Sequence, residues 1–245
     1  MDSIIRVLNK VIDIIFYLIL LSILSVSLYA LVDAKLVSNS AIVESELLEA
    51  AESEGDELFE VLDRDSEYVI GWLRIYGTNI NYPVAQANDN AWFLNRNYRG
   101  EFATAGSLFL DYRNNSNFTD GFSIIYGHRM GNGEMFSDIH KYKDSNYFWK
   151  HRSGLLRLRG GDIELKVVAY AEVNAEDWRI YNVEESRDNY GIVDYILDGA
   201  EIKSENAISD NGYILLSTCD GSEKNKRNVL LVKKMTLWPF MHGGV

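Results

Sequence analysis

The segment Tyr213-Ile214-Leu215-Leu216-Ser217-Thr218 is an apolar run that directly precedes Cys219, the only cysteine of the chain. It is bounded by the turn-forming residues Asp210-Asn211-Gly212 on one side and by a polar loop that starts at Asp220 on the other. A short run of aliphatic and aromatic residues between such turns is typical of a buried β-strand. The lone cysteine is therefore expected where a buried strand gives way to an exposed loop.

The same pattern of short apolar runs between turn-forming residues recurs from residue 68 onward. Short runs rich in β-branched and aromatic residues, separated by clusters of Gly, Asn and Asp, predict further strands at Val69–Tyr76, Ser107–Tyr112, Phe122–Tyr126, Leu155–Arg159, Ile163–Tyr170 and Asn228–Met235. Seven or more short strands within about 170 residues indicate a mainly β fold, either a closed barrel or a sandwich. Two stretches, Met135–His151 and Glu184–Ile202, are expected to be helical.

The N-terminal part of the chain contains the apolar run Val11–Val32, which has a single charge near its start. About 20 apolar helical residues cross the hydrocarbon core of a membrane, so residues 11–32 are predicted to be a single uncleaved anchor. Arg6 and Lys10 precede the run, which favours a cytoplasmic location for residues 1–10 and an extracellular one for the rest. The small-residue site Val32-Asp33-Ala34 leaves a cleaved signal peptide as the alternative.

The net charge of the chain is −12, from 24 basic and 36 acidic residues, which argues against a nucleic-acid partner. Most of this charge belongs to residues 33–67, with twelve acidic and two basic residues, and we expect them to form an acidic helical spacer. Residues 68–245 are then the main domain. One cysteine and four scattered histidines give no metal-binding spacing, and no cofactor is expected.

Cys219 can be a small buried residue or a nucleophile, and a nucleophile needs a base nearby. Of the four histidines, His128 has the most suggestive position, because it follows the strand Phe122–Tyr126 in a strand-end setting like that of Cys219. The other three are expected to be surface residues or part of a frayed tail: His140, His151 and His242.

Arg227 begins the last predicted strand, eight residues after Cys219. A β-hairpin would return it to the side of the cysteine, where a guanidinium could stabilise an oxyanion. The alternative is a solvated loop cation beside Lys224 and Lys226.

These residues together resemble a known family. Tyr126-Gly127-His128, Leu216-Ser217-Thr218-Cys219 and Arg227 are similar to the His–Cys–Arg signature of the sortases, cysteine transpeptidases of Gram-positive cell surfaces. Further segments resemble the class B sortases in particular: Ile70-Gly71-Trp72-Leu73-Arg74-Ile75, Ile80-Asn81-Tyr82-Pro83-Val84-Ala85-Gln86, Gly106-Ser107-Leu108-Phe109-Leu110-Asp111 and Gly131-Asn132-Gly133-Glu134-Met135-Phe136. The resemblance covers about residues 68–235, with the segments in matching order.

The resemblance implies a closed eight-stranded sortase-type barrel with N-terminal helices and a helix in the long connection before the cysteine strand. It implies that Cys219 attacks a threonine carbonyl in a C-terminal sorting signal, that His128 is the acid/base and that Arg227 stabilises the oxyanion. An amine from a cell-wall peptide or a pilin lysine would then resolve the thioester. By similarity, the residues that line the substrate groove would be Asn90, Leu94, Trp178, Ile180, Ser217, Thr218 and Asp220.

Several alternatives stay open at this point. The short spacing from Cys219 to Arg227 and the apolar tail Thr236–Met241 depart from what we expect of wall-anchoring class B members, so a pilin-polymerising enzyme is the main alternative. A cysteine protease that only hydrolyses, or a non-catalytic binding module, is less favoured. The segment Asp111–Asn115 fails the calcium-loop pattern, because Arg113 stands where an acid is needed.

Overall fold

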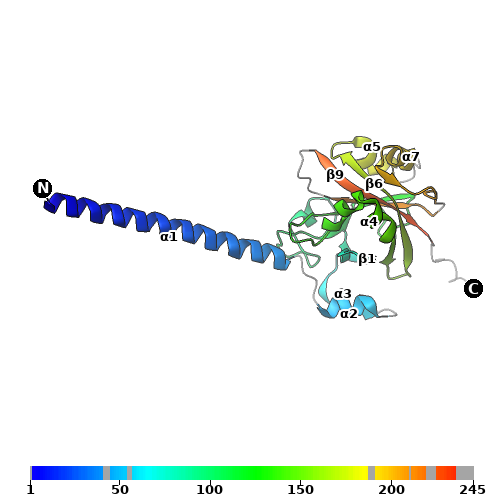
Figure 1. Cartoon of the computed structure of the whole chain (residues 1–245). Coiled ribbons are helices and arrows are strands. Elements are labelled where there is room, and N and C mark those ends of the chain that lie inside the picture. The colour runs from blue at the N-terminus through cyan, green and yellow to red at the C-terminus, as the bar shows by residue number, and fades with distance from the viewer. Residues whose placement is uncertain are drawn as a thin grey trace, which may run out of the picture. The chain divides into compact units, whose positions relative to one another are not determined.

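The computed structural model describes residues 2–40, 45–53, 57–186, 191–209, 211–218 and 225–235, in two compact units. The first unit is the helix α1 (Asp2–Ser40), of which Ile4–Val32 is long and apolar enough to cross a membrane (Figure 1). At 1.5 Å per residue this stretch is about 43 Å long, more than the ~30 Å of a hydrocarbon core. α1 also takes in the first residues of the predicted spacer.

The second unit is built on a closed β-barrel. Its strands are β1 (Val69–Ile75), β2 (Asn81–Ala85), β3 (Leu108–Leu110), β4 (Phe122–Gly127), β5 (Ser153–Arg157), β6 (Ile163–Asn174), β8 (Tyr213–Thr218) and β9 (Lys226–Lys234). The order β5-β1-β2-β3-β4-β8-β9-β6 closes on itself through the pairing of β5 with β6, and β7 (Ile202–Lys203) adds to β6 outside the ring. The expectation of a closed eight-stranded barrel is confirmed.

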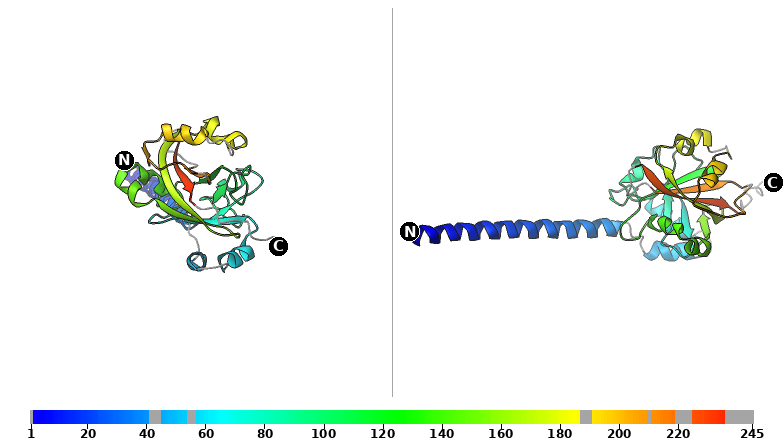
Figure 2. Two further views of the ribbon diagram at one scale, coloured as in Figure 1. Left: turned by 90° about the vertical axis from the view of Figure 1, so that its right-hand side faces the viewer. Right: turned by 45° about the horizontal axis from the view of Figure 1, so that its top comes forward.

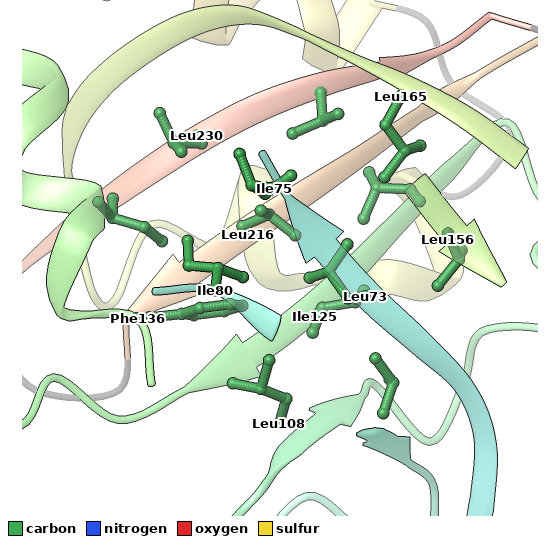
Figure 3. Packing of buried hydrophobic residues seen from close by; sticks show 14 of the residues in the cluster. Leu73, Ile75, Ile80, Leu108, Ile125, Phe136, Leu156, Leu165, Leu216 and Leu230 are labelled. Atoms are coloured by element: carbon green, nitrogen blue, oxygen red, sulfur yellow. The ribbon is translucent and has the colours of Figure 1, made fainter. Parts of the chain in front are cut away.

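The interior of the barrel is a hydrophobic core of alternate residues from facing strands. Figure 3 shows Leu73, Ile125, Leu216 and Leu230 converging from four strands that lie far apart in the sequence. The residues that alternate with these along each strand, such as Leu215 next to Leu216 on β8, point outward into a second core. The alternation of side chains along each strand thus produces an inner and an outer apolar face.

Helices cover the outer faces on opposite sides of the barrel (Figure 1, Figure 2). On one side lie α2 (Ser45–Glu52) and α3 (Glu57–Asp65), which pack on Val69 and Trp72 of β1. On the other side lie α5 (Trp178–Tyr181), α6 (Val183–Ser186) and α7 (Gly191–Asp198), which cover β4, β6, β8 and β9. The expected N-terminal helices and the expected helix before the cysteine strand are both present.

The two predicted helical stretches are shorter and more divided than the sequence suggests. Met135–His151 contains the 3-10 helix η2 (Ser137–Lys143) and then α4 (Ser145–Lys150), because Asp144 adopts an extended conformation and its carboxylate caps the backbone N–H of Tyr147. Glu184–Ile202 contains the end of α6, α7 and the start of β7. A short 3-10 helix η1 (Trp92–Leu94) follows β2.

A buried lysine fastens the end of β9. Lys234 is 1% exposed, and its Nζ donates to the carbonyl oxygens of Phe118 and Asp120 at 2.8 and 2.7 Å. Burial, which disfavours the charged form, lowers the pKa of Lys234 to about 8 in spite of the nearby Asp120 carboxylate. The ammonium therefore holds the loop between β3 and β4 at an electrostatic cost.

This cost gives a testable dependence of stability on pH. Lysine in an unfolded chain has a pKa of about 10.4, so the unfolded state binds more protons than the folded state between about pH 8 and pH 10. The free energy of unfolding should therefore rise with pH across this window, by at most about 3 kcal/mol. Urea unfolding of a protein that comprises residues 35–245, repeated at several pH values, measures this rise of the unfolding free energy with pH. The Lys234→Met variant should not show the rise. An equal slope in the two proteins would contradict the assignment.

Candidate active site

The strands β4 and β8 are parallel neighbours and end together. Their register pairs Tyr126 with Ser217 and Gly127 with Thr218, the last residues of the two strands. His128 follows Gly127 directly, and Cys219 follows Thr218 directly in the sequence. Cys219 itself lies outside the described residues, as does Asp220. The structure therefore brings His128 to the end of the strand that leads into Cys219, from a position about 90 residues earlier in the chain.

Arg227 is returned to the same end by the antiparallel pairing of β8 with β9. The register pairs Ser217 with Val229, and the Thr218 hydroxyl bonds to both the N–H and the carbonyl oxygen of Asn228. Arg227 Nη1 donates to the carbonyl oxygen of Thr218 at 3.0 Å. Among the described residues, Arg227 Nε has no hydrogen-bond partner. The pairing therefore returns Arg227 to the end of β8, and one of its donors is not committed within the described residues.

His128 is oriented by the backbone of η1. Its Nε2 lies 2.8 Å from the carbonyl oxygen of Leu94. A carbonyl can only accept, so Nε2 carries the proton and Nδ1 is the ring nitrogen left for proton exchange. Gly106, at φ +62°, packs against the carbonyls of Phe93 and Leu94 and against the His128 ring, where a Cβ would clash. The histidine ring is thus held between η1 and the Gly106 turn.

Tyr181, a residue that the sequence analysis did not select, connects the arginine to the strand end. Its ring lies under the Arg227 guanidinium, 5.4 Å from Cζ to the ring centroid. Its hydroxyl lies 3.1 Å from Ser217 Oγ, so the two hydroxyls share a hydrogen bond. Tyr181 is the last residue of α5, the helix that contains the expected groove residues Trp178 and Ile180. Only the three-dimensional contact distinguishes Tyr181 from its neighbours.

The predicted groove residues differ in how much of them is accessible. Leu94 and Trp178 are 40% and 64% exposed, whereas Ile180 is 1% exposed and packs in the outer core. Ser217 and Thr218 are fully buried. Trp178 also borders a cavity of about 200 Å³ with Arg179 and Tyr195.

The Asn90 side chain makes its hydrogen bonds within the protein. Its Nδ2 donates to Asp111 Oδ2 at 2.8 Å, and its Oδ1 accepts from the backbone N–H of Tyr112 at 3.0 Å. The side chain therefore braces the loop after β3 against the loop that leads into η1.

His140 and His151 belong to other elements, η2 and the end of α4. His140 is an exposed residue of η2 whose Nδ1 contacts the carbonyl of Ser137, and His151 packs on the ring of Tyr147. His242 lies outside the described residues. Within the part of the chain that the structure describes, no group of three or more His, Cys, Asp or Glu residues could hold a metal ion.

Known proteins share both the sequence pattern and the barrel. A family model described as the sortase domain matches residues 73–236. Sortase B of Listeria monocytogenes is 32% identical in an alignment of 179 residues that covers 70% of this chain and 71% of that protein. A crystal structure from Bacillus anthracis, of a protein described as similar to sortase B, matches with a TM-score of 0.63 and 30% identity and covers 72% of this chain and 81% of that one. A class B sortase of Streptococcus pyogenes involved in pilus biogenesis matches with a TM-score of 0.65 and 26% identity, over 71% of this chain and 97% of that one.

Proposed function

The chain belongs to the sortase family, among its class B members, and from this premise we propose that it cleaves a C-terminal sorting signal after threonine and transfers the acyl group to an amine. As a sortase-type cysteine transpeptidase it needs a nucleophile, an acid/base and a group that stabilises negative charge. We assign these roles to Cys219, His128 and Arg227.

This assignment rests on one observation: the registers of β4 and β9 against β8, when extended past their last pairs, both lead to Cys219. Extended by one position, the parallel pairing of Gly127 with Thr218 would set His128 beside Cys219. The antiparallel pairing of Ser217 with Val229, extended by two positions, would set Arg227 opposite Cys219. The barrel thus supports a nucleophile flanked on both sides, by an imidazole from β4 and by a guanidinium from β9.

In the first half of the reaction the Cys219 thiol gives its proton to His128 Nδ1, and the resulting thiolate attacks the threonine carbonyl carbon, so that a C–S bond forms. The oxyanion that develops would be stabilised by Arg227, whose planar group presents several donors in a fixed array. When the C–N bond breaks, the leaving nitrogen takes a proton from His128 Nδ1. The product is a thioester on Cys219 and a released C-terminal peptide.

In the second half an amine attacks the thioester carbonyl, and the C–S bond breaks. The attacking amine gives its proton to His128 Nδ1, and the thiolate leaves on Cys219. A new amide bond forms and the enzyme returns to its starting state. A thioester is reactive enough for this attack, which is why a cysteine serves an acyl transfer between two amides.

For the sorting signal, we propose a groove bordered by η1 and α5. Leu94 and Trp178 would contact the peptide with their exposed side chains. The other expected groove residues, Asn90, Ile180, Ser217 and Thr218, would shape the walls from within, and Asp220 would follow the nucleophile in its loop.

The anchor would place this groove at the cell surface. Ile4–Val32 is a single apolar helical stretch, and Arg6 and Lys10 favour a cytoplasmic N-terminus. The catalytic domain would then face the extracellular side, where surface or pilin proteins that carry a sorting signal and the amine acceptor are found.

Mass spectrometry of a peptide reaction tests the proposal. Residues 35–245, which contain all the described hydrophobic cores, would be incubated with sorting-signal peptides and with either a cell-wall-type peptide amine or a lysine-bearing peptide. We expect an amine-linked product that the wild-type protein forms and that does not appear without the amine. A preference for the lysine-bearing acceptor would favour pilin polymerisation, and a preference for the wall-type amine would favour wall anchoring. Hydrolysis without amine capture would contradict the proposed transfer.

A further inference from the structure

Asp111 is a fully buried carboxylate at the end of β3 that no step of the reaction uses. Its Oδ2 accepts hydrogen bonds from Asn90 Nδ2 at 2.8 Å and from the Tyr126 hydroxyl at 3.1 Å. Both its oxygens are also paired with Arg113, with Nε to Oδ1 at 2.9 Å and Nη2 to Oδ2 at 2.8 Å. The carboxylate is thus the meeting point of three separate segments.

Arg113 extends this cluster to a fourth segment. Its Nη2 also donates to the carbonyl oxygen of Tyr181, at the end of α5, at 2.9 Å. The ring of Tyr126 is stacked on the ring of Tyr181, with 6.3 Å between centroids and an interplanar angle of 26°. The guanidinium therefore links the loop after β3 directly to the helix that carries Trp178.

Each segment held by the pair also bears part of the candidate site. Asn90 lies four residues before Leu94, whose carbonyl orients His128. Tyr126 lies two residues before His128 on β4. Tyr181 supports the Arg227 guanidinium with its ring. The two walls of the proposed groove, η1 and α5, are thus fastened to the same ion pair.

The chemistry of the pair is suited to a fixed geometry. A fully buried carboxylate is costly unless it is paired and fully hydrogen-bonded, and Asp111 meets both conditions. Burial alone would raise the pKa of Asp111, but the hydrogen bonds from Arg113 and Asn90 outweigh it and lower the pKa below its usual value. A guanidinium can donate in two directions at once in a rigid plane, which a lysine ammonium does not reproduce.

We propose that Asp111 and Arg113 form a positioning pair that sets the separation of the η1 and α5 walls and thereby the fit of the sorting-signal peptide. The inference rests on the proposed function for its link to substrate, but the mechanical link between the walls stands on the contacts alone. The pair does not touch the reacting atoms. Its effect on turnover is indirect, through the alignment of the peptide with Cys219, His128 and Arg227.

The test is Arg113→Lys in the full-length chain in detergent. The variant keeps a positive charge beside Asp111. Its single ammonium group, however, cannot donate to both carboxylate oxygens and to the Tyr181 carbonyl as the planar guanidinium does. Because small misplacements can cost up to about 100-fold in rate, we expect kcat/KM for the peptide to fall by about 10- to 100-fold, mainly through KM. Alkylation of Cys219 by iodoacetamide, which needs no bound peptide, should change much less than kcat/KM. Hydrogen exchange should become faster at residues 86–94 and 175–183.

Arg157→Lys is the matched control. Arg157, which is buried where Arg113 is half-buried, also pairs with an aspartate, Asp162, and donates to backbone carbonyls, those of Ala51 and Ser53, but under α2. We expect it to lower the melting temperature with no change in kcat/KM. Equal losses of kcat/KM in both variants, or unchanged exchange at the two walls in Arg113→Lys, would overturn the proposal.

Two further arms keep the experiment decisive. If Arg113→Lys does not fold, Asp111→Asn takes its place, since it keeps the side-chain volume and removes the ion pair. If the wild-type protein transfers no peptide at all, the proposed function fails while the exchange measurement still decides whether the pair holds the walls together.

Discussion

Replacing Cys219 with alanine is expected to reduce formation of the amine-linked product by about 10,000-fold or more, to below detection. Without the thiol no thioester forms, and among the described residues at the end of β8 no free hydroxyl can replace it. Ser217 and Thr218 are fully buried, and their hydroxyls are engaged by Tyr181 and Asn228. The measurement is the rate of product formation by mass spectrometry with a signal peptide and its preferred amine.

Cys219→Ser is the companion variant, because it changes one atom and retains the shape of the side chain. A serine hydroxyl is a much weaker nucleophile without a strong adjacent base, so this variant should be nearly as inactive as alanine. The chain has one cysteine, so an alkylating reagent labels only the wild-type protein and gives an independent count of reactive sites. Turnover by Cys219→Ala near that of the wild type would remove the cysteine from the mechanism.

Local sequence patterns predict the parts of the fold that are set by short runs of residues. The strand-forming runs, the apolar anchor-like stretch and the acidic helical segment are all legible in the sequence, and the resemblance to class B sortases implied the closed barrel. The strands β2 and β7 were not among the predicted strands. The break at Asp144 was missed too, although an aspartate followed by a serine is a common start of a helix.

The site could be predicted where its residues lie at the ends of recognisable strands. His128 and Arg227 are such residues, and the structure brings both to the end of β8. Tyr181 and Asp111 could not be found in this way, since their roles arise from contacts between segments far apart in the chain. Arg113 was noted only because it spoils a calcium-loop pattern, and the structure shows the reason for its presence: it pairs with Asp111.

Replacing His128 with alanine is expected to reduce turnover of a peptide substrate by about 100- to 10,000-fold, the usual contribution of a general acid or base. The leaving nitrogen of an amide must be protonated as it departs, and Nδ1 of His128 is the donor that the Leu94 contact leaves available. The matched control is His140→Ala, which removes an exposed histidine from η2 and should leave the rate unchanged. The measurement is kcat/KM of the three proteins with the same signal peptide.

An ester version of the signal peptide separates proton donation from a purely structural role. An alkoxide-type leaving group depends less on protonation than an amide nitrogen, so a general acid should matter less for the ester than for the amide. We therefore expect His128→Ala to lose much less activity on the ester than on the amide. The amide side chain of His128→Gln can still donate to the Leu94 carbonyl but cannot act as a general acid. This variant should therefore be as inactive as His128→Ala. Equal losses on ester and amide, together with rescue by glutamine, would show instead that His128 acts by holding η1 in place.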